Sequence, residues 1–215
     1  MGHIAEILDH ASPVLPVLVV ENPQLALPLA EALLRGGLAV LELTLRTPQA
    51  LESLWLIQQE LPEMVGGAGT VLDAEQARQA QQAGAAFVVS PGYTESLAQV
   101  TKGLDLPWLP GVQTASEILQ AREAGLRRLK LFPAGAGGLT LLDNFAGPFQ
   151  DMMFCPTGGI HAGNLGEYLA RPNVACCGGS WLAPQALLDA QNWDGITALA
   201  REAVAIAERQ RFVDK

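Results

Sequence analysis

One lysine in this chain occupies a position where a charged side chain is costly. Lys130 stands between two leucines in Arg-Leu-Lys-Leu-Phe-Pro (128–133), a segment with the composition of a buried strand. An ammonium group moved into an apolar interior is strongly destabilised unless it is paired or gives up its proton. A neutral lysine amine is a nucleophile that forms Schiff bases with ketones. Lys130 is therefore the first candidate for covalent chemistry, although a lone strand lysine more often reaches solvent from a strand end.

A second set of polar residues lies in Leu-Ala-Val-Leu-Glu-Leu-Thr-Leu-Arg-Thr-Pro (38–48). Successive strand side chains point to opposite faces, so Glu42, Thr44 and Arg46 share one face and the intervening leucines share the other. We expect the leucines to pack on helices and the polar face to point inward. A buried carboxylate beside a lysine suits either a structural ion pair or proton transfer. Arg46 suits a substrate carboxylate, because its planar guanidinium makes two parallel hydrogen bonds.

Short apolar segments alternate with amphipathic segments along the chain, which predicts strands alternating with helices. Capping residues support several helix starts, including Asp73, Thr94 and the capping box from Thr114 to Glu117. The predicted strands are Val14–Val20, Leu38–Leu45, Met64–Val71, Phe87–Ser90, Trp108–Val112, Arg128–Phe132, Met152–Pro156 and Val174–Gly178. The predicted helices cover 3–11, 23–35, 48–60, 73–83, 94–103, 114–124, 138–146, 161–170 and 184–211.

This alternation predicts the α/β class, with a parallel sheet covered by helices. Eight strand–helix units can close into a (β/α)8 TIM barrel, which needs roughly 200 residues or more. An open doubly wound sheet is the competing fold, but it usually carries a glycine-rich turn after its first strand. That position here reads Val-Val-Glu-Asn-Pro (19–23), without glycine. We therefore expect residues 1–215 to form a single barrel domain, with the short N-terminal helix closing its bottom.

Barrel enzymes build their sites from the C-terminal ends of the strands. Thr70 follows the glycine-rich end of the third predicted strand, where its hydroxyl can bind a ligand or simply the backbone. Pro91 lies in Ser-Pro-Gly after the fourth strand, and such a turn either shapes a pocket wall or only ends the strand. Gly-Gly pairs follow the last two strands, in Pro-Thr-Gly-Gly-Ile (156–160) and Cys-Gly-Gly-Ser-Trp (177–181). Backbone N–H groups of such loops bind phosphate in many barrels, and Ser180 adds a hydroxyl.

The composition and the spacing of residues argue against several classes of function. The net charge of −9 argues against nucleic-acid binding, which needs a basic surface. Three cysteines without CxxC spacing argue against a disulfide framework or a zinc site, and His3, His10 and His161 do not cluster in the sequence. We therefore expect neither a metal nor another cofactor. No signal peptide or apolar stretch of about 18 residues is present, so we expect a cytoplasmic protein with no membrane partner.

Taken together, these segments resemble the class I aldolases that act on 2-keto-3-deoxy-6-phosphogluconate (KDPG) and 4-hydroxy-2-oxoglutarate (KHG). The resemblance keeps the motifs in order over nearly the whole chain. The matching segments are Gly-Gly-Leu-Ala-Val-Leu-Glu-Leu-Thr-Leu-Arg-Thr-Pro (36–48), Gly-Ala-Gly-Thr-Val (67–71), Val-Ser-Pro-Gly (89–92), Leu-Pro-Gly-Val (109–112), Leu-Lys-Leu-Phe-Pro-Ala (129–134), Phe-Cys-Pro-Thr-Gly-Gly-Ile (154–160) and Gly-Gly-Ser-Trp-Leu (178–182).

The resemblance implies a role for each matching residue. Lys130 corresponds to the Schiff-base lysine and Glu42 to the general acid and base. Arg46 and Thr70 correspond to the groups that bind the pyruvate carboxylate. The remaining matches are Pro91 and Phe132 in the pocket wall, Thr157 with an influence on stereochemistry at C4, and Gly158, Gly159, Gly179 and Ser180 at the phosphate. Members of the family are homotrimers that use no metal.

One loop departs from the family pattern, because Gly-Ala-Gly-Gly (135–138) stands where relatives commonly carry a glutamate in a slightly longer loop.

We expect cleavage of KDPG to pyruvate and glyceraldehyde 3-phosphate in the Entner–Doudoroff pathway. Aldolases for KHG or for 2-keto-3-deoxy-6-phosphogalactonate are the alternatives within the class. A barrel isomerase or sugar-phosphate binder, in which Lys130 only pairs with Glu42, and a noncatalytic ligand-binding barrel are the alternatives outside it.

Overall fold

The computed structural model describes residues 4–11, 13–135 and 137–213, with residues 211–213 described by their backbone alone. Within these residues, eight strands form one parallel sheet in the order β7-β6-β5-β4-β3-β2-β1-β8. The strands are β1 Val14–Leu18, β2 Val40–Thr44, β3 Val65–Gly69, β4 Phe87–Ser90, β5 Trp108–Val112, β6 Arg128–Leu131, β7 Met153–Pro156 and β8 Cys177–Gly179.

The sheet curls into a barrel whose two edges meet at β7 and β8. Single parallel bridges join Phe154 to Val174 and Thr157 to Gly178 across that seam. The other neighbouring strands pair over two to five residues each. The predicted TIM-barrel fold is thus confirmed, with its weakest pairing between the last two strands.

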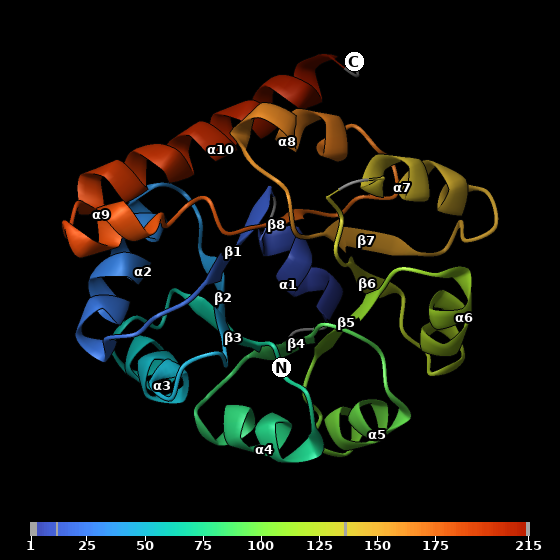
Figure 1. Cartoon of the computed structure of the whole chain (residues 1–215), viewed down its shortest axis with the longest axis horizontal. Coiled ribbons are helices and arrows are strands. Elements are labelled where there is room, and N and C mark those ends of the chain that lie inside the picture. The colour runs from blue at the N-terminus through green and yellow to red at the C-terminus, as the bar shows by residue number, and fades with distance from the viewer. Residues whose placement is uncertain (1–3, 12, 136, 214–215) are drawn as a thin grey trace.

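Helices surround the barrel, as Figure 1 shows in a view that looks into the ring of strands. The helix α10 crosses the outside of the ring beside α2 and α8. The helical elements are α1 Ile4–Ala11, η1 Pro23–Leu25, α2 Ala26–Arg35, α3 Ala50–Glu60, α4 Ala74–Gln82, α5 Glu95–Gly103, α6 Ala115–Glu123, α7 Gly138–Ala146, α8 Ala162–Leu169, α9 Gln185–Asp189 and α10 Trp193–Val213.

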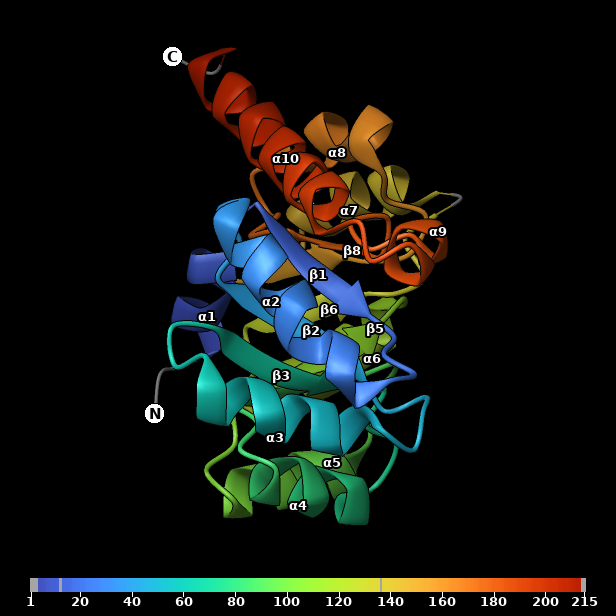
Figure 2. The same cartoon turned by 90° about the vertical axis from the view of Figure 1, so that its left-hand side faces the viewer.

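The short helix α1 closes one end of the barrel. Its buried residues Ile4, Ile7 and Leu8 belong to a core cluster that also contains interior side chains of the strands, among them Val40 and Phe87. Figure 2 shows α1 at the end where the strands begin, opposite the arrowheads. The expected closure of the barrel bottom is therefore present, although His3, at the start of the predicted helix, lies outside the described residues.

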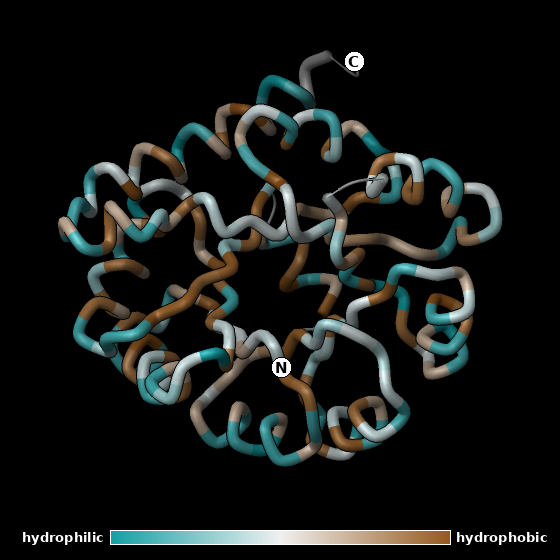
Figure 3. Tube along the Cα trace, in the orientation of Figure 1, coloured by the Kyte–Doolittle hydropathy of each residue, from teal (hydrophilic) through white to brown (hydrophobic). Residues whose placement is uncertain are grey.

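A second and larger core fills the space between the strands and the surrounding helices. It includes Leu41 and Leu43 from β2, whereas Val40 belongs to the cluster inside the barrel. In Figure 3 the strands are largely brown, and brown and teal alternate along the helices, as expected for helices with one buried face. The predicted division of β2 into a leucine face toward the helices and an inward polar face is confirmed.

Most predicted elements differ from the observed ones by a residue or two at their ends, and two elements differ more. The last helix is interrupted: α9 ends at Asp189, Gln191 adopts a left-handed φ of 48°, and Asn192 accepts a hydrogen bond from Gly195 N–H at 2.9 Å to start α10. Asn192 is a good N-cap that the prediction overlooked. The eighth strand begins at Cys177 rather than at Val174, because pairing with β1 starts only where Cys177 N–H donates to the carbonyl of Pro13.

Candidate active site

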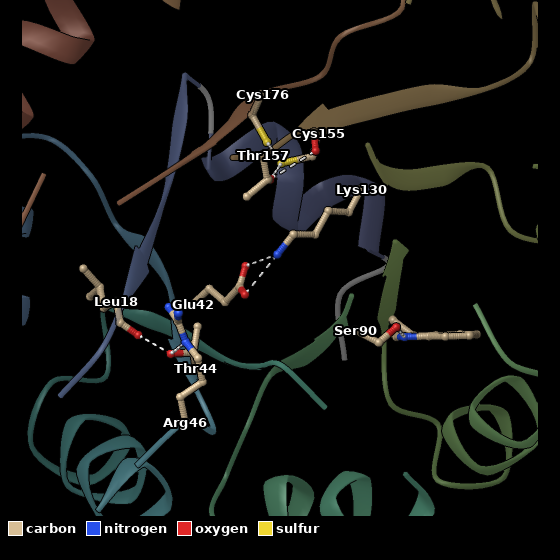
Figure 4. Close-up of polar contacts among 10 residues, drawn as sticks. Leu18, Glu42, Thr44, Arg46, Ser90, Lys130, Cys155, Thr157 and Cys176 are labelled. Atoms are coloured by element: carbon tan, nitrogen blue, oxygen red, sulfur yellow. Dashed lines mark hydrogen bonds and ion pairs between the residues drawn. The ribbon is translucent and has the colours of Figure 1, made fainter. Parts of the chain in front are cut away.

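Lys130 and Glu42 meet across the interior of the barrel. They lie on β6 and β2, with β3, β4 and β5 between them in the sheet. Lys130 Nζ is 3.3 Å from Glu42 Oε1 and 3.4 Å from Oε2, as the dashed lines in Figure 4 show. Lys130 is 6% exposed and Glu42 is 1% exposed. The structure therefore brings together two charged side chains that lie 88 residues apart in the chain.

A glycine makes room for the Glu42 carboxyl group. Gly69 ends β3 beside Thr44 of β2, and a Cβ atom built on Gly69 would overlap the Glu42 side chain. The neighbouring inward position on β3 is Gly67, where a Cβ atom would overlap the Phe87 ring. The glycine-rich sequence of β3 thus lets larger side chains from neighbouring strands cross the barrel interior.

Arg46 lies just after the end of β2 and is exposed, while Thr44 within the strand is buried. Arg46 Nε donates to Thr44 Oγ1 at 3.2 Å. Thr44 Oγ1 in turn donates to the carbonyl of Leu18 on β1 at 2.9 Å. Figure 4 shows Arg46 and Thr44 beside Glu42. The polar face predicted for this strand therefore reaches from the barrel interior to its rim.

Thr70 follows β3 directly, at the C-terminal end of the barrel, and adopts φ of 58°. This left-handed conformation is a genuine outlier for a β-branched residue. Such strain persists only where surrounding structure enforces it, and it is concentrated at functional sites. The strain therefore adds a structural argument for Thr70 that its sequence context did not contain.

The β4–α5 loop, which carries Pro91, folds over β5. A Cβ atom on Gly111 would overlap the Pro91 carbonyl oxygen, so the loop needs a glycine beneath it. Ser90 Oγ donates to the Gly92 carbonyl at 2.7 Å and accepts from Trp108 Nε1 at 2.9 Å. These buried contacts, which sequence reasoning missed, fix the turn around Pro91.

Phe132 lies beside the lysine, with its ring centroid 5.3 Å from Lys130 Nζ. The ring is 36% exposed, so one part faces solvent. A cation near an aromatic face is stabilised by the ring's quadrupole. The peptide bond between Phe132 and Pro133 is cis. Phe132 therefore lies beside Lys130 at the end of β6, and its role in the pocket wall stays a prediction.

Thr157 is buried at the seam of the barrel, directly after β7. Its Oγ1 donates to the carbonyl of Cys155 at 3.3 Å. A Cβ atom on the bridging Gly178 would overlap the Thr157 side chain, which repeats the arrangement of Gly69 and Glu42. The sequence analysis noted the glycines at both positions, but it did not predict that Gly69 makes room for Glu42 and Gly178 for Thr157.

The predicted phosphate-binding loop has the backbone that its glycines allow. Gly158 and Gly159 adopt φ of 92° and 76°, which disfavours other residues. Next to them, His161 caps α8 by accepting from Gly163 N–H at 3.1 Å, which gives this histidine a structural role. Asn164 Nδ2 binds the Gly159 carbonyl at 2.9 Å and ties the loop to the same helix.

The second glycine pair, Gly178 and Gly179, forms the end of β8 itself, one residue beyond the predicted end of that strand. Gly179 is covered by the Trp181 ring, which would overlap a Cβ atom at that position, and Ser180 is exposed. The Thr157–Gly178 bridge holds the ends of β7 and β8 together. The two predicted phosphate segments therefore leave adjacent strands at the same end of the barrel.

The loop that departs from the family pattern packs beside these glycines. Ala134 N–H donates to the Thr157 carbonyl at 2.8 Å, and Tyr168 Oη donates to the Ala134 carbonyl at 3.0 Å. Gly137 adopts a φ of 91° at the start of α7, while Ala136 lies outside the described residues. The part of this loop that the structure describes is thus attached to the end of β7.

The three cysteines are free and buried. Cys176 Sγ donates a hydrogen bond to Cys155 Sγ across 3.6 Å. This hydrogen bond and burial raise the pKa of the Cys176 thiol well above its ordinary value, and burial raises the pKa of Cys177.

Groups of three or more His, Cys, Asp or Glu side chains suited to a metal ion are not found in the described part of the chain. None of its helices is both long and apolar enough to cross a membrane.

This geometry can be compared with known proteins. The aldolase family of KDPG and KHG aldolases matches residues 4–199. The chain belongs to this family. The 2-dehydro-3-deoxy-phosphogluconate aldolase of Dickeya dadantii is 48% identical over 202 residues, which are 94% of this chain and 95% of that protein. The KHG/KDPG aldolase of Escherichia coli K12 is 47% identical over 201 residues, 93% of this chain and 94% of that protein. This KDPG/KHG aldolase family member is accordingly a lyase.

Solved structures agree with the assignment. The KDPG aldolase of Legionella pneumophila, with pyruvate captured at low pH as a covalent carbinolamine intermediate, is 44% identical and superposes with a TM-score of 0.89 over 91% of this chain and 96% of that one. The thiamine phosphate pyrophosphorylase of Pyrococcus furiosus, at 17% identity, a TM-score of 0.65 and coverage of 95% and 98%, shares the fold alone.

Proposed function

We propose that this aldolase reversibly cleaves 2-keto-3-deoxy-6-phosphogluconate to pyruvate and D-glyceraldehyde 3-phosphate through a Schiff base on Lys130. This is the aldol cleavage of the Entner–Doudoroff pathway. The observation that carries the proposal is the buried contact between Lys130 Nζ and the Glu42 carboxyl group, at 3.3 Å and 3.4 Å. Two charged groups that face each other inside an otherwise closed barrel are arranged for proton exchange and nucleophilic attack.

In the first step, the neutral amine of Lys130 attacks the C2 ketone of the substrate. A proton moved from Nζ to Glu42 along their contact leaves the amine with a free lone pair. Proton transfers through Glu42 then allow the carbinolamine to lose water and become an iminium ion. The positive iminium nitrogen is the electron sink for the next step.

Glu42 next accepts the proton of the C4 hydroxyl, through a bridging water. The C3–C4 bond breaks, its electron pair moves toward the iminium nitrogen, and glyceraldehyde 3-phosphate leaves. The remaining enamine is protonated at C3, and hydrolysis of the resulting iminium releases pyruvate and regenerates Lys130. Each proton removed is returned within one cycle, so no cofactor is needed.

Other residues orient the substrate in this proposal. Arg46 and Thr70 bind the carboxylate next to C2, which presents the ketone to Lys130 in a near-attack geometry. Pro91 and Phe132 form the pocket wall, and Thr157 lies near C4. The phosphate binds to backbone N–H groups and one hydroxyl, from Gly158, Gly159, Gly179 and Ser180.

The test is trapping with pyruvate and borohydride, followed by peptide mass mapping. We expect a reduced pyruvyl adduct on the peptide that contains Lys130, and no adduct or turnover in Lys130→Ala. Lys102→Ala, which changes an exposed lysine on α5, is the matched control and should be trapped normally. A folded wild-type protein that forms no adduct would leave Lys130 as a structural partner of Glu42 and favour an isomerase or a binding barrel.

A second candidate is cleavage of KHG, because a relative at 47% identity carries both names, KHG and KDPG aldolase. The galactonate epimer is a more distant candidate, supported by a structure described as native KDPGal at 27% identity and a TM-score of 0.84 over 93% of this chain and 96% of that one. Measuring kcat/KM for KDPG, its C4 epimer and KHG separates the three. A higher value for KHG than for KDPG would reverse our order.

We further propose that the active protein is a cytoplasmic homotrimer in which residues 1–215 form one domain. The resemblance to trimeric relatives supports this assembly, as do exposed apolar side chains such as Trp55, which is 48% exposed, and Leu72, which is 57% exposed. Light scattering after size exclusion measures the assembly directly. A monomeric mass at micromolar concentration would contradict the trimer.

A further inference from the structure

The guanidinium group proposed to bind the substrate carboxylate has a fixed partner. Arg46 is exposed, and an exposed arginine side chain samples many rotamers. Within the described residues, its guanidinium makes one hydrogen bond, from Nε to Thr44 Oγ1 at 3.2 Å. This bond uses Nε and leaves the outer Nη1–Nη2 edge free, which is one of the two edges that can hold a carboxylate bidentately.

Thr44 is held so that its oxygen faces Arg46. Its side chain is 2% exposed, and its hydroxyl has only one proton to donate. That proton is donated to the Leu18 carbonyl at 2.9 Å. The oxygen lone pairs are therefore directed away from Leu18 and are available to Nε. The β1 strand thus fixes the direction of the Thr44 hydroxyl, and the hydroxyl fixes Arg46.

A second threonine provides an internal comparison. Thr47 Oγ1 donates to the Val20 carbonyl at 2.6 Å, so the chain on both sides of Arg46 is attached to the end of β1. Thr47 joins the segments that directly follow β2 and β1, but in the described part of the chain no hydrogen bond links it to the Arg46 guanidinium. A variant without the Thr47 hydroxyl therefore measures the effect of losing a bond to the chain after β1, with the bond between Thr44 and Arg46 still present.

We propose that Thr44 is a positioning residue for the substrate. Its hydroxyl, oriented by the Leu18 carbonyl, holds the Arg46 guanidinium so that the Nη1–Nη2 edge faces the carboxylate beside C2. This inference rests on the proposed function. It assigns to Thr44 an effect on substrate binding rather than on bond cleavage, because Thr44 acts on the carboxylate end of the substrate and not on the reacting atoms.

The experiment compares Thr44→Val, which keeps the shape but removes the hydroxyl, with Thr44→Ser, which keeps it. We expect Thr44→Val to raise KM for KDPG about tenfold, the usual size of a lost hydrogen bond to a charged group, with kcat changed less than threefold. Thr44→Ser should stay within about threefold of wild type in both constants. Thr47→Val should leave KM within about twofold. Equal effects of Thr44→Val and Thr47→Val would show a structural attachment only and overturn the proposal.

A double-mutant cycle with Arg46→Ala tests whether Thr44 acts on substrate binding through Arg46. If Thr44 acts through Arg46, Thr44→Val should have no further effect on KM in the Arg46→Ala background. Additive effects would overturn the proposal that Thr44 acts through Arg46. If Thr44→Val does not fold, Thr44→Ala replaces it in the same cycle. Pyruvate trapping of the wild type keeps the two proposals apart: failure to trap refutes the Schiff-base function, whereas normal trapping with an unchanged KM in the hydroxyl-free variant refutes the role of Thr44.

Discussion

At the scale of single residues, the proposed chemistry depends on the pair of Lys130 and Glu42. Burial of two charges is strongly unfavourable, and their mutual attraction often only offsets the loss of hydration. A pair of this kind adds little stability compared with apolar residues of the same volume. Stability alone therefore does not explain its presence inside the barrel, which is the physical argument for the reactivity that we propose.

Glu42→Gln tests proton transfer at this pair. The amide keeps the shape and can still accept a hydrogen bond from Lys130, but it cannot take up a proton. We expect kcat to fall by roughly 10²-fold or more, the usual contribution of a positioned acid or base. The measurement is steady-state cleavage of KDPG, and Glu52→Gln on the outside of α3 is the matched control. A kcat within threefold of wild type would remove Glu42 from the mechanism.

Thr70 offers a test of strain at the rim. Its φ of 58° is unfavourable for threonine and open to glycine. We expect Thr70→Gly to leave the free energy of unfolding unchanged or raise it by up to about 1 kcal/mol, since relief of strain offsets the greater freedom of the unfolded chain.

The same variant should lose affinity for the carboxylate, and KM for KDPG should rise. Denaturant unfolding and steady-state kinetics measure the two effects separately. Thr70→Ser, which retains the hydroxyl, is the control for binding. A clear loss of stability in Thr70→Gly together with a normal KM would show that the strained backbone has no functional role.

At the scale of elements, β3 shapes the site through residues without side chains. Gly69→Ala places a methyl group where the Glu42 carboxyl group lies. Because Glu42 is attached to a rigid strand, its side chain must swing away from Lys130. We expect kcat to fall by at least tenfold while the barrel still folds.

Gly103→Ala is the control, since a Cβ atom there meets no neighbouring atom. Circular dichroism checks folding, and cleavage of KDPG checks activity. Full activity in Gly69→Ala would mean that Glu42 can reach Lys130 from another rotamer.

The capping box at the start of α6 contains an ionisable carboxyl group, which permits a prediction about how stability depends on pH. Partial burial acts to raise the pKa of Glu117, but hydrogen bonds from Gln113 N–H, Thr114 Oγ1 and Thr114 N–H, each 2.8 Å, outweigh it and leave that pKa below its ordinary value. A carboxyl group with a lowered pKa in the folded state stabilises the protein above its unfolded pKa. This contribution is lost as the pH falls through the folded value.

Glu117→Ala should therefore lower the free energy of unfolding by roughly 0.5 kcal/mol at pH 7, since solvent screens an exposed carboxylate. The difference from wild type should shrink as the pH falls below about 4, the ordinary range of a glutamate pKa. Urea unfolding at several pH values measures it. Glu123→Ala, at the other end of the same helix, is the control. A difference that does not depend on pH would show that the ionised carboxylate is not the stabilising form.

At the scale of the whole molecule, the barrel interior is divided into an apolar end and a polar end. The helix α1 and its neighbours fill the end where the strands begin, Glu42 and Lys130 lie within β2 and β6, and Thr157 directly follows β7 at the other end. Cys155 and Cys176 belong to the apolar part. The two thiols are therefore shielded from solvent, whereas the Lys130 side chain keeps an exposed fraction of 7%.

Thiol reactivity tests this division. The thiolate is the reactive form, and the raised pKa values of Cys176 and Cys177 lower its amount at pH 8. We expect the native protein to react with a disulfide reagent such as dithionitrobenzoate at least 10²-fold more slowly than the protein unfolded in guanidinium, in which all three thiols titrate. Rapid reaction of Cys155 or Cys176 in the native protein, located by peptide mapping, would show that the bottom of the barrel opens to solvent.

Much of the secondary structure was predictable, because strand faces and helix caps depend on residues close together in the chain. Alternating side chains on β2 separated the leucines from Glu42, and the bounds of β4 and β5 matched the prediction. The N-caps Asp73, Thr94 and Thr114 each accept the hydrogen bond expected of them. Where a local signal was overlooked, as with Asn192, the prediction ran two helices together.

The contacts across the barrel were not predictable in the same way, because they join residues far apart in the chain. The sequence by itself determined that Lys130 and Glu42 face inward on separate strands, since the strand period alone sets the face of each side chain. Only the tertiary structure decided that they meet, that Gly69 and Gly178 make room for Glu42 and Thr157, and that Thr44 holds Arg46. These features depend on the register and closure of eight strands, and closure is a property of the whole sheet rather than of any segment.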